Sequence, residues 1–328
     1  MKKNTLTFLQ IGLGSMGKRR IRNLHAAGEK NIIGFDFSPE RRREAEETYH
    51  IKTVGDLGGL SPKEFDAVLI STPPDKHGDY IRFAIKHRKH FYTEVGTTND
   101  GYSNIFSAKK GLIMAPSSTF LHFLPVQMMK RLVGQGKIGK LLLFEYHVGQ
   151  YLPTFHPWED YRKIYISKKE TGSCRTLFLF ECVWLNSLVG STIDDISGMI
   201  GKVSDLEMTA DDFLSANIRY KNDVQGTILI ELLSRKPGRS LRLIGSSGVI
   251  EWDWLASVIR LYDESGKAKI ISVPKGNPAK GYLAAEEMYN AEIKAFIDAI
   301  RGKAAYPFTF KEDLANMNML QRLEKGRR

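Results

Sequence analysis

The chain has 328 residues, of which 42% are hydrophobic, 10% aromatic and 26% charged. This ordinary composition excludes a disordered, collagen-like or coiled-coil protein, and the length indicates about two domains. The formal net charge is +11. Such a surplus is compatible with nucleic acid, an anionic membrane surface or an acidic small molecule as a partner. Because the excess of basic residues is divided between the two predicted domains and the sequence contains no recognisable nucleic-acid-binding motif, we expect no nucleic-acid binding.

The cysteine content and the lengths of the apolar runs indicate where in the cell the protein is located. The two cysteines, Cys174 and Cys182, cannot build a disulfide framework, so we expect a reducing, cytoplasmic compartment. The first apolar run is of strand length and is broken by Gln10, which is not typical of a signal peptide. No stretch of about 18 apolar residues is present, so we expect no membrane-spanning helix.

Strands and helices alternate over the first third of the chain. Apolar runs predict strands at residues 5–11, 31–36, 65–71, 90–93 and 112–114. A helix is predicted over 18–27, and a second begins at Pro39 with Ser38 as its N-cap. A third helix is predicted after the third strand and ends at Lys89. This alternation is typical of a parallel sheet with both faces covered. We therefore predict a doubly wound α/β domain over residues 1–118.

The pattern changes after residue 118. A helix is predicted over 120–134, a second over 176–189 and a closing helix over 286–301. Strands joined by hairpin signals are predicted at residues 141–148, 213–220, 224–233, 240–244, 248–254 and 258–262. Residues 119–328 are thus expected to form an α+β domain with a large, mostly antiparallel sheet that exposes one face. Whether the C-terminal segment packs on the first domain is left open.

A glycine-rich turn follows the first predicted strand and begins the first predicted helix. Its sequence is Gly12-Leu13-Gly14-Ser15-Met16-Gly17, the G-x-G-x-x-G pattern of Rossmann domains. Gly12 permits the tight turn, Gly14 admits a pyrophosphate, and Gly17 allows close packing of helix and strand. We predict that the phosphates bind at the helix N-terminus, beside Ser15 and Met16, with added positive charge from the run Lys18-Arg19-Arg20.

The cofactor is predicted to be NAD. Asp36 ends the second strand about 20 residues after the glycines, where a carboxylate accepts hydrogen bonds from the ribose and repels a 2′-phosphate. Arg41 and Arg42 leave NADP open. The run Ser71-Thr72-Pro73 lies at the ligand-binding edge of the sheet, and His77 follows as either a cofactor-site residue or a surface histidine.

With these residues in place, the chain resembles the Gfo/Idh/MocA family of NAD(P)-dependent sugar oxidoreductases over essentially its full length. The resemblance rests on the G-x-G-x-x-G run, on Ser71-Thr72-Pro73-Pro74 with His77, on Glu94, and on residues 136–141 and 306–309. It implies a Rossmann domain followed by an α/β domain with a large sheet. It also implies a homodimer or homotetramer formed through that sheet, a sugar or sugar-nucleotide substrate, and Glu94 beside the nicotinamide, although a role in holding the loop backbone is an open alternative.

Two departures from the family pattern concern catalysis. The family usually has Glu-Lys-Pro after the fourth predicted strand, but this chain has Glu94-Val95-Gly96 and lacks the lysine. The family also has a helix histidine that accepts a proton, whereas residues 172–190 contain no histidine. The usual acid–base pair therefore cannot be transferred to this chain.

The segment 147–162 is the candidate replacement, since it is dense in aromatic and titratable residues. His156 is the predicted proton acceptor, with Tyr161 or Tyr151 as alternates. Substrate contacts are predicted for Tyr151 and Trp158, which can stack on a sugar, and for Arg162, which can bind a phosphate or carboxylate. A structured loop without catalytic function is the alternative interpretation.

Glu181 is a lone carboxylate in a nearly all-apolar predicted helix. Burying it unpaired would cost several kcal/mol, so we expect it to be paired, neutral or facing a polar cleft. It is either a catalytic carboxylate, with Arg175 holding an acidic part of the substrate, or half of a buried Arg175–Glu181 pair.

Three functional hypotheses follow. The first is an NAD-dependent oxidoreductase that moves a hydride between a carbinol carbon of a sugar and nicotinamide. The second is a catalytically degenerate NAD-binding sensor or partner protein, motivated by the missing lysine and histidine. The third is an NAD-dependent glycoside hydrolase or lyase.

Overall fold

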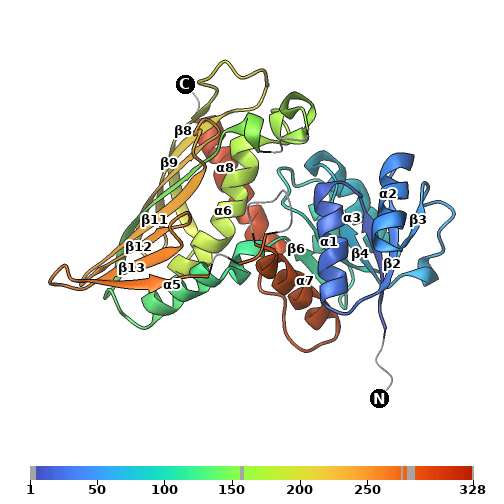
Figure 1. Cartoon of the computed structure of the whole chain (residues 1–328), viewed down its shortest axis with the longest axis horizontal. Helices are drawn as coiled ribbons and strands as arrows, with labels where there is room; N and C mark the ends of the chain where they lie inside the picture. The colour runs from blue at the N-terminus through green and yellow to red at the C-terminus, as the bar shows by residue number, and fades with distance from the viewer. Residues whose placement is uncertain (1–4, 156–158, 275, 279–284, 327–328) are drawn as a thin grey trace. The chain divides into compact units, whose positions relative to one another are not determined.

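The chain folds into two compact units. The computed structural model describes residues 5–155, 159–274, 276–278 and 285–326, so the predictions for His156 and Trp158 lie outside the described residues. One unit comprises Met1–Thr119 with Asn277–Asp313, and the other comprises Phe120–Gly276 with Leu314–Arg328 (Figure 1). The chain thus leaves the first unit after Thr119 and returns to it at Asn277.

A six-stranded parallel sheet forms the centre of the first unit, which confirms the predicted doubly wound sheet. Its order is β3-β2-β1-β4-β5-β6. The strands are β1 (Thr7–Ile11), β2 (Asn31–Phe35), β3 (Lys52–Val54), β4 (Ala67–Ile70), β5 (His90–Thr93) and β6 (Met114–Pro116). Because the strands are parallel, the residues that follow β1, β2, β4 and β5 meet at one edge of the sheet.

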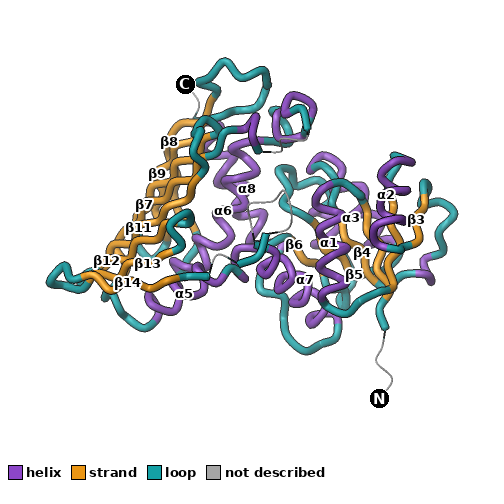
Figure 2. Tube along the Cα trace, in the orientation of Figure 1, coloured by secondary structure: helices purple, strands orange, loops and turns teal. Residues whose placement is uncertain are grey.

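Helices pack around this sheet. They are α1 (Ser15–Ala26), α2 (Pro39–Tyr49), α3 (His77–Lys86), α4 (Tyr102–Ser107) and α7 (Glu286–Ile300), with short 3-10 helices at Pro62–Glu64 and Pro74–Lys76. Ser38 caps α2 as predicted, because its side chain accepts a hydrogen bond from Arg41 N. Helix α7 packs beside α1 and buries Ile293 and Phe296 in the core of this unit, so the returning segment completes the first unit (Figure 2).

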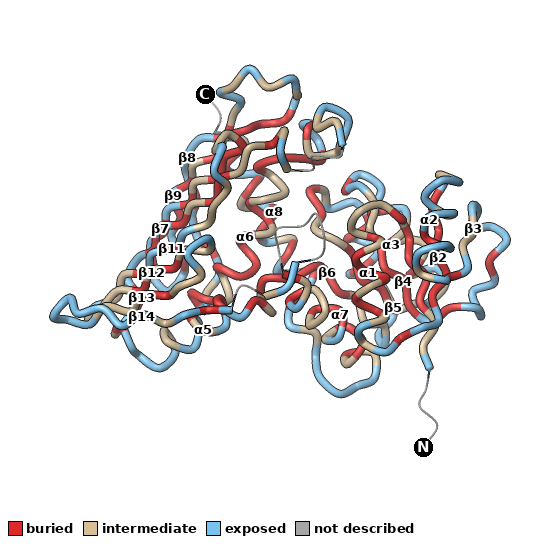
Figure 3. The backbone as a smooth tube through the Cα atoms, in the orientation of Figure 1, coloured by how far each residue is buried: buried red, intermediate tan, exposed pale blue. Residues whose placement is uncertain are grey.

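An eight-stranded, mostly antiparallel sheet dominates the second unit, as predicted. Its order is β14-β13-β12-β11-β7-β10-β9-β8, and only β7 and β10 pair in parallel among the described strands. The strands are β7 (Leu141–Gly149), β8 (Ile193–Gly201), β9 (Phe213–Tyr220), β10 (Gln225–Glu231), β11 (Gly238–Gly245), β12 (Val249–Asp253), β13 (Val258–Tyr262) and β14 (Ala268–Ser272). Strand residues alternate between buried and more exposed positions, most regularly in β9 (Figure 3).

Helices α5 (Leu124–Gly134) and α6 (Ser173–Val189) belong to the second unit. Helix α6 is long and apolar, and it buries residues such as Phe178 and Leu185. Helix α8 (Phe310–Lys325) continues from one unit into the other, and short 3-10 helices lie at Thr119–His122, Leu152–Thr154, Tyr161–Lys163 and Tyr165–Ser167. Among the described residues, no helix is long and apolar enough to cross a lipid bilayer.

Candidate dinucleotide site and neighbouring clusters

The glycine turn between β1 and α1 has the geometry that a dinucleotide requires. Gly12 has φ +86°, and a Cβ there would overlap the Ser71 carbonyl oxygen. A Cβ at Gly17 would overlap the carbonyl of Gly12. By contrast, the nearest atom to a Cβ at Gly14 is Arg41 Nη1 at 3.9 Å. The fold itself therefore needs glycine at 12 and 17, whereas Gly14 leaves open space above the turn.

This open space lies at the N-terminus of α1. Helix α1 begins at Ser15, three residues earlier than predicted, and its N-cap Gly14 has no side chain to cap the helix. The first turn has no acidic residue, so the positive end of the helix dipole is not compensated there. An anion such as a pyrophosphate fits this position, next to Ser15 and Met16.

The basic run after the glycines does not supply the predicted positive charge. Lys18 pairs with Glu44, and Arg19 pairs with Glu286 on α7. Arg20 is fully buried between Glu94 and Glu292. Each of these charges already has a carboxylate partner within the first unit, so the prediction that they face the pyrophosphate is wrong.

Asp36 joins the end of β2 to the glycine turn. Its Oδ2 accepts a hydrogen bond from Leu13 N at 2.9 Å, and its Oδ1 accepts one from Ser38 N at 2.9 Å. Arg41 Nη1 lies 3.7 Å from Oδ2, while Arg42 donates to the Asp36 and Phe37 carbonyls. Each carboxylate oxygen has a second lone pair, so this fixed carboxylate is able to accept ribose hydroxyls.

His77 is buried at the start of α3, so the surface-histidine alternative is wrong. Its Nε2 lies 2.9 Å from the carbonyl of Thr72. Burial lowers the pKa of His77 to about 4, so the neutral ring donates its Nε2 hydrogen to that carbonyl. His77 thereby holds the Ser71-Thr72-Pro73 turn in place.

Thr72 offers a polar atom to a ligand. Its Oγ1 is buried and has no hydrogen-bond partner among the described residues. Buried hydroxyls are normally paired, so an orphan at the carboxyl end of β4 favours a bound group there. Together with the space at Gly14 and the fixed carboxylate of Asp36, it indicates that the residues present fit a dinucleotide.

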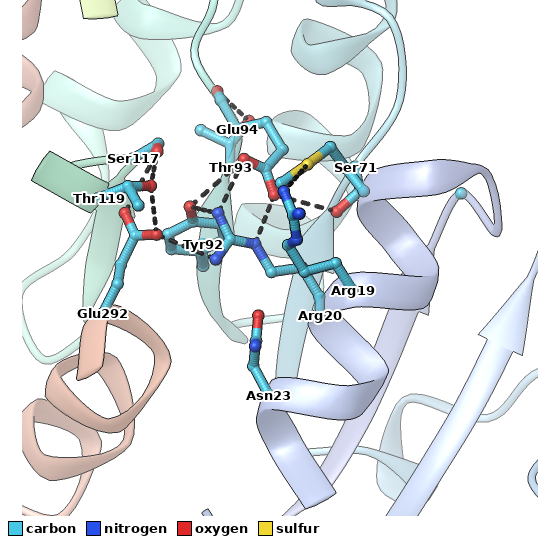
Figure 4. Close-up of polar contacts among 12 residues, drawn as sticks. Arg19, Arg20, Asn23, Ser71, Tyr92, Thr93, Glu94, Ser117, Thr119 and Glu292 are labelled. Carbon is cyan, nitrogen blue, oxygen red and sulfur yellow. Dashed lines mark hydrogen bonds and ion pairs between the residues drawn. The ribbon is translucent and has the colours of Figure 1, made fainter. Parts of the chain in front are cut away.

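Glu94 follows β5 and lies on the same edge of the sheet (Figure 4). Arg20 binds it through two hydrogen bonds, Nε to Oε1 at 2.6 Å and Nη2 to Oε2 at 2.9 Å. Ser71 Oγ is 3.4 Å from Oε1. The Glu94 side chain keeps 15% of its surface exposed, so it remains accessible to a ligand.

In the second unit, Glu181 is fully buried and paired, but its partner is not Arg175. Arg239 of β11 donates to Oε1 from Nη2 at 3.0 Å, while Tyr146 and Trp184 donate to Oε2 at 2.8 and 2.6 Å. Arg175 instead lies 2.8 Å from Glu324 on α8. The alternative of a buried Arg175–Glu181 pair is therefore wrong, and hydrogen-bond donors already occupy both oxygens of Glu181.

The described part of segment 147–162 also engages its polar groups. The Tyr161 phenol oxygen accepts a hydrogen bond from Glu207 N at 3.2 Å. Arg162 binds Asp160 through Nε and Nη2 and contacts Glu207 through Nη1. Carboxylates thus occupy both edges of the Arg162 guanidinium, which does not favour the predicted role of Arg162 in binding a substrate anion.

Tyr151 contacts a cation that was not among the predicted site residues. The guanidinium of Arg235, in the loop after β10, lies 3.6 Å from the Tyr151 ring centroid. A guanidinium stacked on an aromatic ring is oriented by it and keeps its hydrogen-bond donors at the edges. No periodic signal marks this pair in the sequence, because Arg235 is an exposed loop residue.

Comparison with known proteins identifies the family to which the two domains belong. Residues 6–95 match the oxidoreductase family with an NAD-binding Rossmann fold, and residues 126–251 match the GFO/IDH/MocA C-terminal domain. The chain belongs to the Gfo/Idh/MocA oxidoreductase family. It is thus an NAD-binding oxidoreductase, as the resemblance implied. No curated protein matches the chain by sequence.

Several solved structures share the fold. An oxidoreductase from Agrobacterium radiobacter, in complex with NAD+, L-tartaric acid and magnesium, has a TM-score of 0.86 at 14% identity, covering 98% of this chain and 96% of that chain. Levoglucosan dehydrogenase in complex with NADH and levoglucosan has a TM-score of 0.81 at 17% identity, with coverages of 98% and 96%. The WlbA dehydrogenase from Bordetella pertussis, in complex with NADH and UDP-GlcNAcA, has a TM-score of 0.78 at 16% identity, with coverages of 98% and 96%.

Proposed function

We propose that this protein is an NAD-dependent dehydrogenase that oxidises a carbinol carbon of a sugar or sugar nucleotide to a carbonyl, or catalyses the reverse reduction. The observation that carries the proposal is the open, uncapped turn at Gly14 with the fixed carboxylate of Asp36 beside it. The similar proteins whose structures contain levoglucosan or UDP-GlcNAcA support a carbohydrate substrate. When bound, NAD supplies the hydride acceptor, and the chain supplies orientation and proton management.

In this proposal the dinucleotide lies across the carboxyl ends of the strands. The turn Gly12–Gly17, with Ser15 and Met16, holds the pyrophosphate through backbone N–H groups. Asp36 binds the ribose of the adenosine half, and a fixed carboxylate at this position favours NAD over NADP. The other half then lies on the β4–β5 side of β1, next to Ser71, Thr72, Pro73, His77 and Glu94.

The substrate and proton acceptor are assigned from the sequence and from the second unit. His156 remains the proposed proton acceptor and Trp158 a proposed stacking residue, with Tyr161 as the alternate base. Glu181 is not carried forward as a catalytic group, because three donors occupy its carboxylate within the core. Arg235, oriented on Tyr151, replaces Arg162 and Arg175 as the proposed contact for an acidic part of the substrate.

Assembly and location are further parts of the proposal. We propose a homodimer or homotetramer formed through the exposed face of the eight-stranded sheet, where Leu143 is 36% exposed and Ile270 is 64% exposed. Multi-angle light scattering checks this, and a monomer at micromolar concentration would contradict it. The buried free thiols Cys174 and Cys182 support a reducing compartment, the cytoplasm.

The activity is tested with a panel of free sugars, sugar acids and nucleotide sugars, each incubated with NAD and the full-length protein while NADH absorbance is followed. We expect turnover with at least one member that carries an acidic group, and loss of affinity for that member in Arg235→Gln. Tight binding of NADH without turnover of any member, in either direction, would favour the cofactor-binding sensor. Loss of a panel member, followed by mass spectrometry, without net NADH formation would favour the hydrolase or lyase.

A further inference from the structure

Arg20 is an arginine with no exposed surface, and it lies on α1 one turn after the glycine motif. Burial alone would lower the pKa of Arg20, but the carboxylates of Glu94 and Glu292, with the phenol of Tyr92, raise it well above its usual value. The guanidinium is therefore charged, and it contacts Glu94, Glu292 and Tyr92 (Figure 4). Such a buried charge is retained only where its partners are well placed.

One side of the guanidinium is anchored to the scaffold. Arg20 Nη1 lies 2.9 Å from Oε2 of Glu292, a fully buried carboxylate on α7. Glu292 also accepts hydrogen bonds from Ser118 N at 2.5 Å and Thr119 Oγ1 at 2.7 Å, just after β6. With these partners Glu292 is fixed and lacks exposed surface, so it serves as an anchor and not as a ligand site.

The other side of the guanidinium faces the cofactor edge of the sheet. Its Nε and Nη2 bind both oxygens of Glu94 in the paired geometry that orients a carboxylate most strictly. Tyr92 accepts a further hydrogen bond from Nη2. Arg20 therefore fixes the orientation of the Glu94 carboxylate, while part of the Glu94 side chain stays accessible.

The strand order tells which half of the cofactor meets Glu94. Asp36 follows β2, on one side of β1, whereas Glu94 follows β5, on the other side. In a doubly wound sheet a dinucleotide crosses this edge with its pyrophosphate over β1. If Asp36 binds the adenosine half, then Glu94 is on the side of the nicotinamide half.

We propose that Arg20 is a positioning residue that holds Glu94 in the orientation needed to bind the nicotinamide half of NAD, using Glu292 on α7 as its anchor. This inference rests on the proposed function only in taking NAD as the cofactor. It assigns a specific function to the buried charge cluster that joins α1, β5, β6 and α7. It also predicts that disturbing the cluster affects one half of the cofactor and spares the other.

The test is calorimetric titration of the full-length protein with two probes, NADH and ADP, which lacks both the nicotinamide and its ribose. Arg20→Lys keeps the charge but lacks the planar fork that orients both Glu94 oxygens, so we expect NADH affinity to fall roughly tenfold while ADP affinity changes by less than about twofold. Glu94→Gln, which retains the Arg20–Glu292 pair, should give the same selective loss. Arg82→Lys, on the surface of α3, is the matched control and should change neither affinity.

Equal weakening of both probes in Arg20→Lys and Glu94→Gln would overturn the proposal, because it would show a general structural role. Unchanged NADH affinity in both variants would also overturn it. If Arg20→Lys fails to fold, Glu94→Gln alone decides between these outcomes. A wild-type protein that binds neither probe would instead remove the cofactor assignment itself.

Discussion

At the scale of single residues, burial decides which chemistry a side chain retains. His77 is 4% exposed, and its pKa is lowered to about 4 by burial. An unfolded chain binds a proton at this histidine near pH 6.5, so the folded state loses stability as the pH falls from 6.5 toward 4. Above pH 6.5 the contribution of His77 to the free energy of unfolding is fully present.

We therefore predict that His77→Gln flattens the pH dependence of stability. Glutamine keeps an N–H donor for the Thr72 carbonyl but does not titrate. Between pH 7 and pH 4 the wild type should lose up to about 3 kcal/mol more of its free energy of unfolding than the variant. Urea unfolding at both pH values measures this difference, and parallel losses in the two proteins would contradict the assignment.

Ion pairs between distant residues are difficult to predict from sequence. The apolar context of Glu181 did indicate that its carboxylate needs a partner, but the nearest basic residue, Arg175, is not that partner. The partner is Arg239, 58 positions away, because β11 brings it across the sheet to α6. Similarly, the sequence pattern predicts that Arg20 lies near the pyrophosphate. Its actual partner, Glu292, lies on a helix far along the chain, so the sequence pattern does not reveal this pair.

At the scale of elements, hydrophobic periodicity located those strands that bury a regular face. The predicted bounds of β9 (Phe213–Tyr220) and β13 (Val258–Tyr262) agree with the structure. The strands β3, β8 and β14 were missed, because β3 is short and most residues of β8 and β14 are exposed. Such strands have little apolar patterning for a sequence-based prediction to detect.

The link between α6 and β11 leads to a stability prediction. Arg239→Met leaves Glu181 buried without its charged partner, so we expect the free energy of unfolding to fall by about 3–5 kcal/mol. The double variant Glu181→Gln with Arg239→Met removes both charges and keeps an amide oxygen that accepts hydrogen bonds from Tyr146 and Trp184, so it should recover a large part of that loss. Chemical denaturation of the two variants and the wild type provides the measurement. A double variant as unstable as the single one would contradict the view that the pair is structural.

At the scale of the whole molecule, the net charge of +11 does not explain cofactor binding. The cations of the run Lys18-Arg19-Arg20 are matched by Glu44, Glu286, Glu94 and Glu292, and Arg41, near Gly14, lies 3.7 Å from Asp36. Binding of the pyrophosphate then depends on backbone N–H groups and on the free space above Gly14, which the sequence motif did predict. The sequence could not show that the anchor of this site comes from α7, since that contact depends on the chain returning to the first unit.

The central claim is that a dinucleotide binds over the turn at Gly14, and one titration tests it most directly. Gly14 has φ −72°, and the nearest atom to a methyl group added there is 3.9 Å away, so Gly14→Ala should fold with an unchanged melting temperature. The added methyl group occupies the space of the pyrophosphate, so we predict a loss of NADH affinity of roughly tenfold or more. Gly59→Ala, which also meets nothing within 4 Å, should leave NADH affinity unchanged. Wild-type NADH affinity in a folded Gly14→Ala protein would contradict the account.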